Sequence, residues 1–254
     1  MANHVLVEVQ NRVQTIRLNR PEKKNALTQA MYLAMTDALR AGEADPAVRV
    51  ILLTGTADCF TAGNDLMDFA SAKPGEPSVA VQFLQVLAGV QKPIIAAVAG
   101  VAVGIGTTML LHCDLVYAAT NTRFQLPFVN LGLCPEAGSS FILPAQMGHH
   151  HAADLLFFGD PFGSIVAREC GIVNEIYPDA ELGAAALAKA VKLTEKPPAA
   201  LRITKSLVKR GQANAVAETM SREGQQFAAL LQAPEAREAM MAFMQKRPPD
   251  FSKF

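Results

Sequence analysis

The sequence predicts an α/β fold that is followed by a helical C-terminal region. Over the first two thirds of the 254 residues, short apolar strand signals alternate with helical ones, a pattern typical of α/β proteins. After Pro197 the pattern is entirely helical. We therefore expect a core at residues 1–195 and a helical region at residues 196–254. The chain is 50% hydrophobic, so it has enough apolar material for one large core.

Each expected element has a local signal. Residues Val5–Gln10 and Val13–Leu18 alternate apolar and polar side chains around Asn11 and Arg12, which predicts a β-hairpin. Thr28 is a suitable N-cap for a helix that extends to about residue 44. The other expected strands are 48–53, 94–98, 114–118, 123–126 and 172–176; the other expected helices are 79–87, 139–147, 151–158, 179–193, 201–210, 216–231 and 235–245, with a helix-turn at 161–171.

The most informative segment extends from the strand at Ile94–Val98 to Glu136. Gly100, Gly104 and Gly106 follow the strand and allow close backbone approach or a positive φ. The first turn of the helix expected after them would offer free N–H groups. Glu136 is a single carboxylate on a Pro/Gly turn between apolar residues. A backbone anion site near one partly desolvated acid indicates proton transfer beside a carbonyl group.

Composition and charge argue against several classes of protein. Twenty-three basic residues balance 23 acidic ones, so no overall field attracts nucleic acid or an anionic membrane. No apolar stretch is long enough to span a membrane, because residues 94–111 contain three glycines. The four cysteines are far apart and lack CxxC spacing, which favours reduced thiols over disulfides or zinc. The consecutive His149, His150 and His151 point in different directions on a helix and cannot chelate one metal ion together.

Six motifs in a fixed order carry a family resemblance. They are LNRPEKKNAL at 18–27, ILLTG at 51–55, FTAGNDL at 60–66, AVAGVAVG at 97–104, CDLVYA at 113–118 and AFMQKR at 242–247. Together they resemble the crotonase superfamily, also called the enoyl-CoA hydratase/isomerase family. The resemblance implies a spiral of ββα units, a C-terminal helical region for site closure and trimerisation, and an acyl-CoA thioester as substrate. It implies no metal and no redox cofactor, because coenzyme A is part of the substrate.

The resemblance also implies the site residues. By position, the backbone N–H groups of Asn64 and Ile105 would stabilise a thioester enolate, a role that backbone donors can fill. The implied substrate contacts are Lys24, Ala26, Ala62, Gly63, Asp65, Leu66, Gly104 and Phe128. Structural alternatives remain: the glycines could serve only turns and packing, Asp65 could cap a helix, and Lys24 could be solvated. Asp114 is expected to order the turn into its strand.

Two further positions bear on the reaction. Hydratases of the family carry glutamates at the positions that match Thr108 and Phe128, and neither side chain here can activate water or protonate a carbanion. A glutamate at Glu136 resembles the peroxisomal-type 3,2-trans-enoyl-CoA isomerases, in which one glutamate moves a proton from C2 to C4. The sequence leaves open a hydratase with a displaced acid, a non-catalytic acyl-CoA-binding protein, and another enolate reaction such as thioester hydrolysis or decarboxylation.

The setting of Glu136 is expected to raise its pKa. A helix beginning at Ser139 would lower the pKa by less than about one unit. Packing against Phe128, Leu133 and Cys134 would raise it by more if burial is deep. The alternative is an ordinary acid on a solvated turn. For the whole protein we expect a homotrimer or a dimer of trimers. We expect it in the cytoplasm, because residues 251–254 do not form a peroxisomal Ser-Lys-Leu signal.

Overall fold

The computed structural model describes residues 3–65, 67, 68 and 78–254. Leu66, an expected substrate contact, therefore lies outside the described residues. The strands are β1 (Val5–Gln10), β2 (Val13–Leu18), β3 (Val50–Thr54), β4 (Ile94–Val98), β5 (Val101–Val103), β6 (Leu115–Ala119), β7 (Arg123–Gln125), β8 (Phe162–Gly163) and β9 (Glu175–Tyr177). The helices are α1 (Gln29–Ala44), α3 (Val79–Gly89), α4 (Ile105–Thr108), α5 (Ser139–Met147), α6 (His149–Phe158), α7 (Ser164–Glu169), α8 (Leu182–Thr194), α9 (Pro198–Arg210), α10 (Ala213–Leu230) and α11 (Pro234–Met244), with 3₁₀ helices η1 (Pro21–Lys23), η2 (Met109–His112) and η3 (Val129–Leu131).

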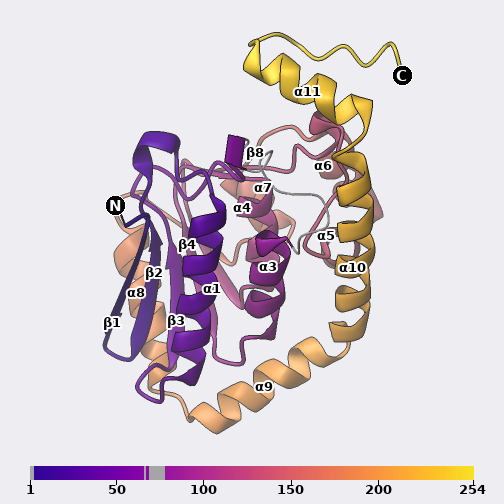
Figure 1. Cartoon of the computed structure of the whole chain (residues 1–254). Helices are drawn as coiled ribbons and strands as arrows, with labels where there is room; N and C mark the ends of the chain where they lie inside the picture. Colours follow the sequence, from indigo (N-terminus) through magenta and orange to yellow (C-terminus); the bar gives the residue numbers. More distant parts are fainter. Residues whose placement is uncertain (1–2, 66, 69–77) are drawn as a thin grey trace.

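The strands form two sheets (Figure 1). The large sheet has the order β1-β2-β3-β4-β6-β9, in which β1 and β2 are antiparallel and all other neighbours are parallel. In the small sheet β7 lies between β5, to which it is parallel, and β8, to which it is antiparallel. This α/β architecture agrees with the predicted fold class.

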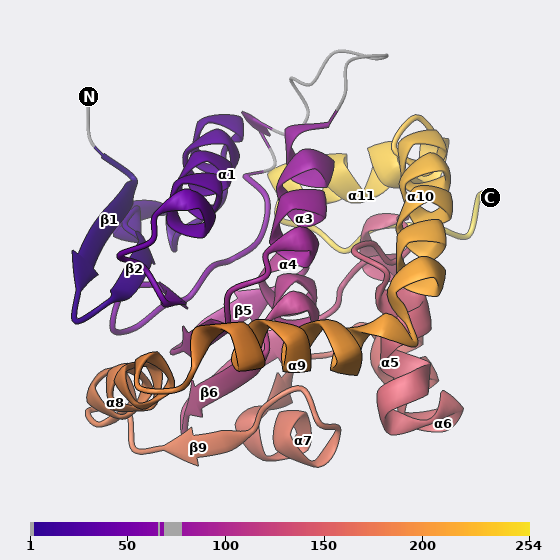
Figure 2. The same ribbon diagram turned by 90° about the horizontal axis from the view of Figure 1, so that it is seen from below.

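Side chains on the large sheet alternate between two cores. On β3, Ile51 and Leu53 join the main core together with α1 and α3, whereas Val50 and Leu52 pack in a second core with Ala186 of α8. Figure 2 shows α1 and α8 on opposite sides of the sheet. Because both faces are covered, β3 and β4 are uninterrupted apolar runs.

The C-terminal helices wrap around the sheets. In Figure 1, α9 passes below the sheets, α10 rises beside α5 and α11 lies across the top. Lys205 of α9 binds Asp114 Oδ2 at 2.6 Å and the Lys92 carbonyl at 2.8 Å. Asp114 Oδ2 also accepts the Ile94 amide at the start of β4, at 2.8 Å. Asp114 therefore has a structural role as expected, but it orders the neighbouring strand and docks α9.

Most predicted elements are confirmed, including the hairpin, the Thr28 N-cap, β4 and α5. The strand predicted at 172–176 is wrong in its first half, because the amides of Ile172 and Val173 bind the Ala167 carbonyl at the end of α7. The apolar side chains of Ile172 and Val173 are buried, although their backbone forms a loop. In the small sheet, the strand predicted at 123–126 is confirmed as β7, whereas β5 and β8 are too short for a periodic signal and were not predicted. No helix in the described part of the chain is both long and apolar enough to cross a membrane.

Asn25 fastens the loop before α1 to the loop after β3. Its side chain is fully buried, with 0% exposure. Its Nδ2 donates to the carbonyls of Cys59 at 2.8 Å and Phe60 at 3.1 Å, and its Oδ1 accepts the Arg20 amide at 2.7 Å. The Thr61 hydroxyl completes the junction by donating to the Asn25 carbonyl at 2.7 Å. Asn25 therefore determines where the chain after β3 begins its path toward Asn64.

We expect Asn25→Ala to lower the free energy of unfolding by about 3 kcal/mol, because it leaves buried carbonyls without donors. The φ of 53° at this position adds to the loss, since alanine tolerates a positive φ poorly. Urea denaturation of both proteins measures the difference. The control is Asn214→Ala on the exposed side of α10, which should change stability by no more than about 0.5 kcal/mol. Equal effects of the two substitutions would contradict the role given to Asn25.

Candidate active site

The chain after β3 runs beside the chain after β4. Thr61 forms a parallel bridge with Ala102, and the Thr61 amide donates to the Val101 carbonyl at 3.0 Å. Asn64 and Ile105 each follow three residues after this bridge in their own segments. The pairing therefore brings the two predicted amide donors to the same end of two adjacent segments.

Two predicted site glycines are required by this local geometry. A Cβ on Gly63 would lie 2.8 Å from the Val103 carbonyl oxygen, so only glycine allows the two segments to approach so closely. Gly104, the N-cap of α4, has φ 55° and ψ −118°, a conformation that a side chain disfavours. The alternative that this glycine serves close packing is therefore correct in part for Gly63. This packing sets the distance between the two segments near Asn64.

The amides of Asn64 and Ile105 are free of protein acceptors within the described residues. Ile105 is the first residue of α4, whose four residues continue into η2. The helix behind Ile105 is thus shorter and more irregular than the sequence suggested, and its dipole is correspondingly small. The side chain of Asn64 is held in place by the Tyr32 hydroxyl, which donates to Asn64 Oδ1 at 2.7 Å.

Glu136 lies on the turn before α5 and is half-buried. The hydroxyl of Thr108, on α4, donates to Glu136 Oε1. Burial raises the pKa of Glu136 to about 7, with a further increase from the charge of Glu223, whereas the Thr108 hydrogen bond opposes the rise. The direction agrees with the sequence prediction. An acid with a pKa near neutrality suits a group that both accepts and returns a proton.

Tyr32 connects the two halves of the site and was not predicted. It is 2% exposed, and its pKa is raised by burial and also by the charge of Glu136. The same hydroxyl donates to Asn64, so Tyr32 lies near both residues. A signal existed in the sequence: a tyrosine on the apolar face of α1 needs a partner for its hydroxyl.

The start of α5 is occupied by Glu223 of α10, another residue that the sequence did not reveal. The Gly138 amide donates to Glu223 Oε2 at 2.5 Å, and the Ser140 amide and hydroxyl donate to Oε1 at 2.8 Å and 2.6 Å. Glu136 therefore does not accept these two amides, and the small lowering of its pKa by the helix start stays a prediction. These contacts span more than 80 residues of sequence, and no local pattern signals them.

Four of the remaining predicted contacts lie in two loops: Lys24 and Ala26 in the loop before α1, and Ala62 and Asp65 in the loop after β3. The Ala62 amide donates to the carbonyl of the exposed Lys24 at 2.9 Å, and the Ala26 carbonyl accepts Arg20 Nη1 at 2.9 Å. Asp65 binds Arg20 at 2.7 Å, which lowers the pKa of Asp65. Asp65 Oδ1 also accepts the amides of residues 67 and 68. Both oxygens of Asp65 thus stabilise the fold, and the capping interpretation is confirmed.

Phe128 lies just before η3, on the chain that leads to Glu136. It is 5% exposed and belongs to the main core. Its carbonyl accepts the amides of Leu131 at 3.0 Å and Leu133 at 2.8 Å, so it shapes the chain that leads to Glu136. His112 supports the next residue of that chain: its Nε2 lies 2.8 Å from the Ala137 carbonyl, and burial lowers its pKa to about 4.

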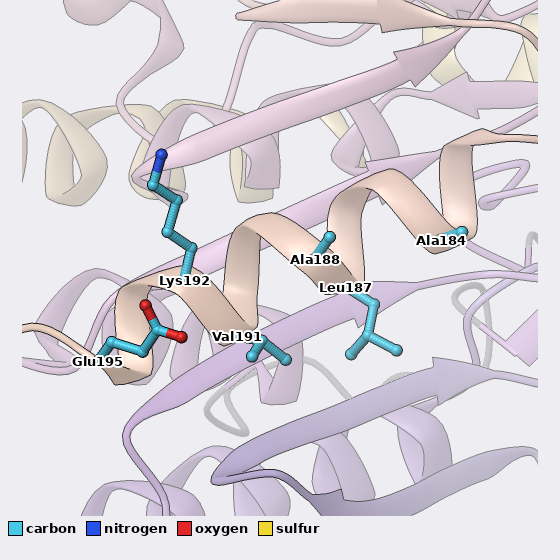
Figure 3. A pocket seen from close by; sticks show the side chains of 6 residues that line it. All are labelled: Ala184, Leu187, Ala188, Val191, Lys192 and Glu195. Carbon is cyan, nitrogen blue, oxygen red and sulfur yellow. The ribbon is translucent and has the colours of Figure 1, made fainter.

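A surface pocket of about 530 Å³ lies along α8, away from these residues (Figure 3). It is lined by Ala184, Leu187, Ala188, Val191, Lys192 and Glu195. The described lining includes none of the predicted site residues. All six lining residues belong to α8 or its C-cap, so the pocket gives no reason to move the candidate site. No group of three or more His, Cys, Asp or Glu among the described residues is arranged to hold a metal ion.

Known proteins resemble this chain along its whole length. A family model described as enoyl-CoA hydratase/isomerase matches residues 8–253. The 2,3-dehydroadipyl-CoA hydratase of Escherichia coli is 33% identical over 98% of each chain. Enoyl-CoA delta isomerase 2 of Rattus norvegicus is 32% identical over 96% of this chain and 64% of its own length. The crystal structure of an enoyl-CoA hydratase/isomerase from Pseudoalteromonas atlantica superposes with a TM-score of 0.94 at 38% identity, covering 98% of this chain and 100% of that one.

The raised pKa of Glu136 predicts a pH-dependent stability. The folded protein binds this proton more tightly than the unfolded chain, so the stabilisation is complete below pH 4.5 and is lost as the pH rises through about 7. Relative to Glu136→Gln, the wild type should lose on the order of 2 kcal/mol between about pH 5 and about pH 8. Urea denaturation at fixed protein concentration measures this difference. The exposed Glu169→Gln serves as control, and a constant difference between wild type and Glu136→Gln at both pH values would refute the prediction.

Proposed function

The chain belongs to the enoyl-CoA hydratase/isomerase family, and from that premise we propose that it is an isomerase that moves the double bond of a 3-enoyl-CoA to the 2-trans position. The observation that carries the proposal is the hydrogen bond from Thr108 to Glu136. Thr108 stands where the family's hydratases carry a glutamate, and here that position supports a single acid instead of supplying a second one. One acid is sufficient for moving a proton, whereas adding water requires a base and an acid.

In the proposed reaction, the carboxylate of Glu136 removes a proton from C2 of the 3-enoyl thioester. The electron pair of the C–H bond spreads over the dienolate, whose negative oxygen accepts hydrogen bonds from the amides of Asn64 and Ile105. Glu136, now protonated, gives the same proton to C4, and the double bond moves to C2–C3. No atom is gained or lost, and the base returns to its first state.

The environment of Glu136 supports both steps. With a pKa of about 7, the side chain is a stronger base than an exposed glutamate when it is ionised, and it remains acidic enough to return the proton. The amides of Asn64 and Ile105 donate to no acceptor in the described part of the chain, so they are available to an oxyanion. The Tyr32 contact fixes the Asn64 side chain beside them.

A hydratase is the alternative within the family, because relatives carry both names. Phe128 is buried in the core and Thr108 is engaged with Glu136, so neither replaces the missing acid.

The proposal extends to the substrate contacts at Lys24, Ala26, Ala62, Gly63, Leu66 and Gly104 and to the resemblance to peroxisomal-type isomerases. It also includes assembly as a trimer or a dimer of trimers and a cytoplasmic location, in keeping with four free cysteines.

The decisive test incubates a 3-enoyl-CoA with wild type and with Glu136→Gln, and follows the conjugated 2-enoyl thioester by ultraviolet absorbance. We expect wild-type turnover and a loss of about 10²–10⁴-fold in kcat for the variant, the range for a removed acid–base group. Binding of a saturated acyl-CoA should persist. Hydration of a 2-enoyl-CoA is measured in parallel, with Glu169→Gln as control. Efficient hydration without isomerisation would overturn the proposal in favour of the hydratase, and release of free CoA would favour thioester cleavage.

Thr108→Val should change the pH dependence of the same reaction. Since the Thr108 hydrogen bond lowers the pKa of Glu136, its removal should move the acidic limb of kcat/KM to higher pH. The shift should be about half a unit to one unit, the equivalent of one hydrogen bond. Thr108→Ser retains the hydroxyl and should restore the wild-type profile. A limb that stays in place in Thr108→Val would show that this hydroxyl does not control the base.

A further inference from the structure

The C-terminal helix α10 contacts the turn that carries Glu136, and one of its contacting side chains is a buried carboxylate. Glu223 is 7% exposed. Its carboxylate takes the amides of Gly138 and Ser140 and the Ser140 hydroxyl, all within 2.8 Å. Gly138 is only two residues after Glu136. The turn that carries the proposed base is therefore attached at its far end to a helix of the C-terminal region.

The place that Glu223 occupies is the one that would most favour an ionised Glu136. The first amides of α5 have no partner within their own helix, and the helix dipole there attracts negative charge. If Glu136 bound these amides, its anion would be stabilised and it would be a weak base. Glu223 instead accepts the amides of Gly138 and Ser140. The charge of Glu223 lies close enough to raise the pKa of Glu136.

We propose that Glu223 is a positioning residue for Glu136, which holds the turn at residues 136–140 and occupies the donors at the start of α5, so that Glu136 remains an effective base. This inference rests on the proposed function of Glu136. It gives the C-terminal helical region a part in proton transfer, because a displacement of α10 would remove both the hold on the turn and the negative charge.

Among the described residues, the other groups near Glu136 leave this electrostatic role to Glu223. From α1, Tyr32 has a pKa raised by burial and by the charge of Glu136, so it stays a neutral phenol. From the same turn, burial raises the pKa of Cys134, which stays a thiol. From η2, His112 has a pKa lowered to about 4 and is neutral near Ala137. Thr108 donates a neutral hydrogen bond.

The test compares the pH profiles of Glu223→Gln and Glu218→Gln in the isomerisation assay. Glu218 lies on the same helix, and its side chain is exposed beside Arg222. Without the charge of Glu223, the pKa of Glu136 should fall, and the acidic limb of kcat/KM should move to lower pH by about half a unit. The plateau kcat should fall as well, because the base is weaker. Glu218→Gln should leave the limb in place. An unmoved limb in Glu223→Gln, or an equal shift in both variants, would overturn the proposal.

Ser140→Ala separates charge from support. It removes one donor to Glu223 and keeps the carboxylate, so thermal stability should fall while the acidic limb does not move to lower pH. A limb moved to lower pH in Ser140→Ala would show that a loosened turn, not the charge of Glu223, sets the base strength. If Glu223→Gln does not fold, a limb moved to lower pH in Ser140→Ala still overturns the proposal.

A titration of Glu136 that needs no substrate turnover tests this inference independently of the proposed function. The carbonyl stretch of protonated Glu136 is identified by infrared difference against Glu136→Gln and followed with pH in wild type and in Glu223→Gln. A lower midpoint in Glu223→Gln supports the coupling, and an identical midpoint refutes it. If the wild type does not isomerise a 3-enoyl-CoA, the proposed function fails, and this titration still tests the effect of Glu223 on Glu136.

Discussion

The buried amide of Asn25 joins stretches of chain that no sheet or helix connects. It binds carbonyls of the loop after β3 and an amide of the loop before α1. From this junction the chain continues in parallel with the segment after β4, where Thr61 pairs with Ala102. The positions of the amides of Asn64 and Ile105 follow from this alignment. Backbone donors have no side chain to aim them, so their geometry is only as exact as the packing of the segments that carry them.

Two glutamates near one helix start have opposite tasks in this structure. Glu223 is surrounded by donors at the start of α5. The carboxyl group of Glu136, three residues before the first residue of α5, accepts one hydroxyl among the described residues, and burial raises its pKa to about 7. The two carboxyl groups differ because burial raises the pKa of Glu136, whereas Glu223 accepts the amides of Gly138 and Ser140. A carboxyl group with a raised pKa can thus lie beside a helix start without accepting the amides there.

The sequence was most informative where a signal is local. The hairpin, β4 and the Thr28 cap follow from side-chain alternation, an apolar run and one capping hydroxyl. The raised pKa of Glu136 followed from its apolar neighbours. Glu223 could not be predicted, because its partners lie more than 80 residues away. In the small sheet, β7 was predicted, whereas β5 and β8 were missed because their pairing, not their composition, defines strands of two or three residues. For Ile172 and Val173, apolar residues indicated burial correctly but not the backbone conformation.

The hydrogen bond between Thr108 and Glu136 also restricts how such a site can change over evolutionary time. Thr108 is fully buried with 0% exposure, and its hydroxyl already touches the carboxyl group of Glu136. A glutamate introduced at position 108 would place two acids in contact, and both could not ionise together. An acid at position 108 is therefore less favourable while Glu136 is present than after Glu136 has been replaced. The order of substitutions, and not only their identity, is thus constrained by one contact.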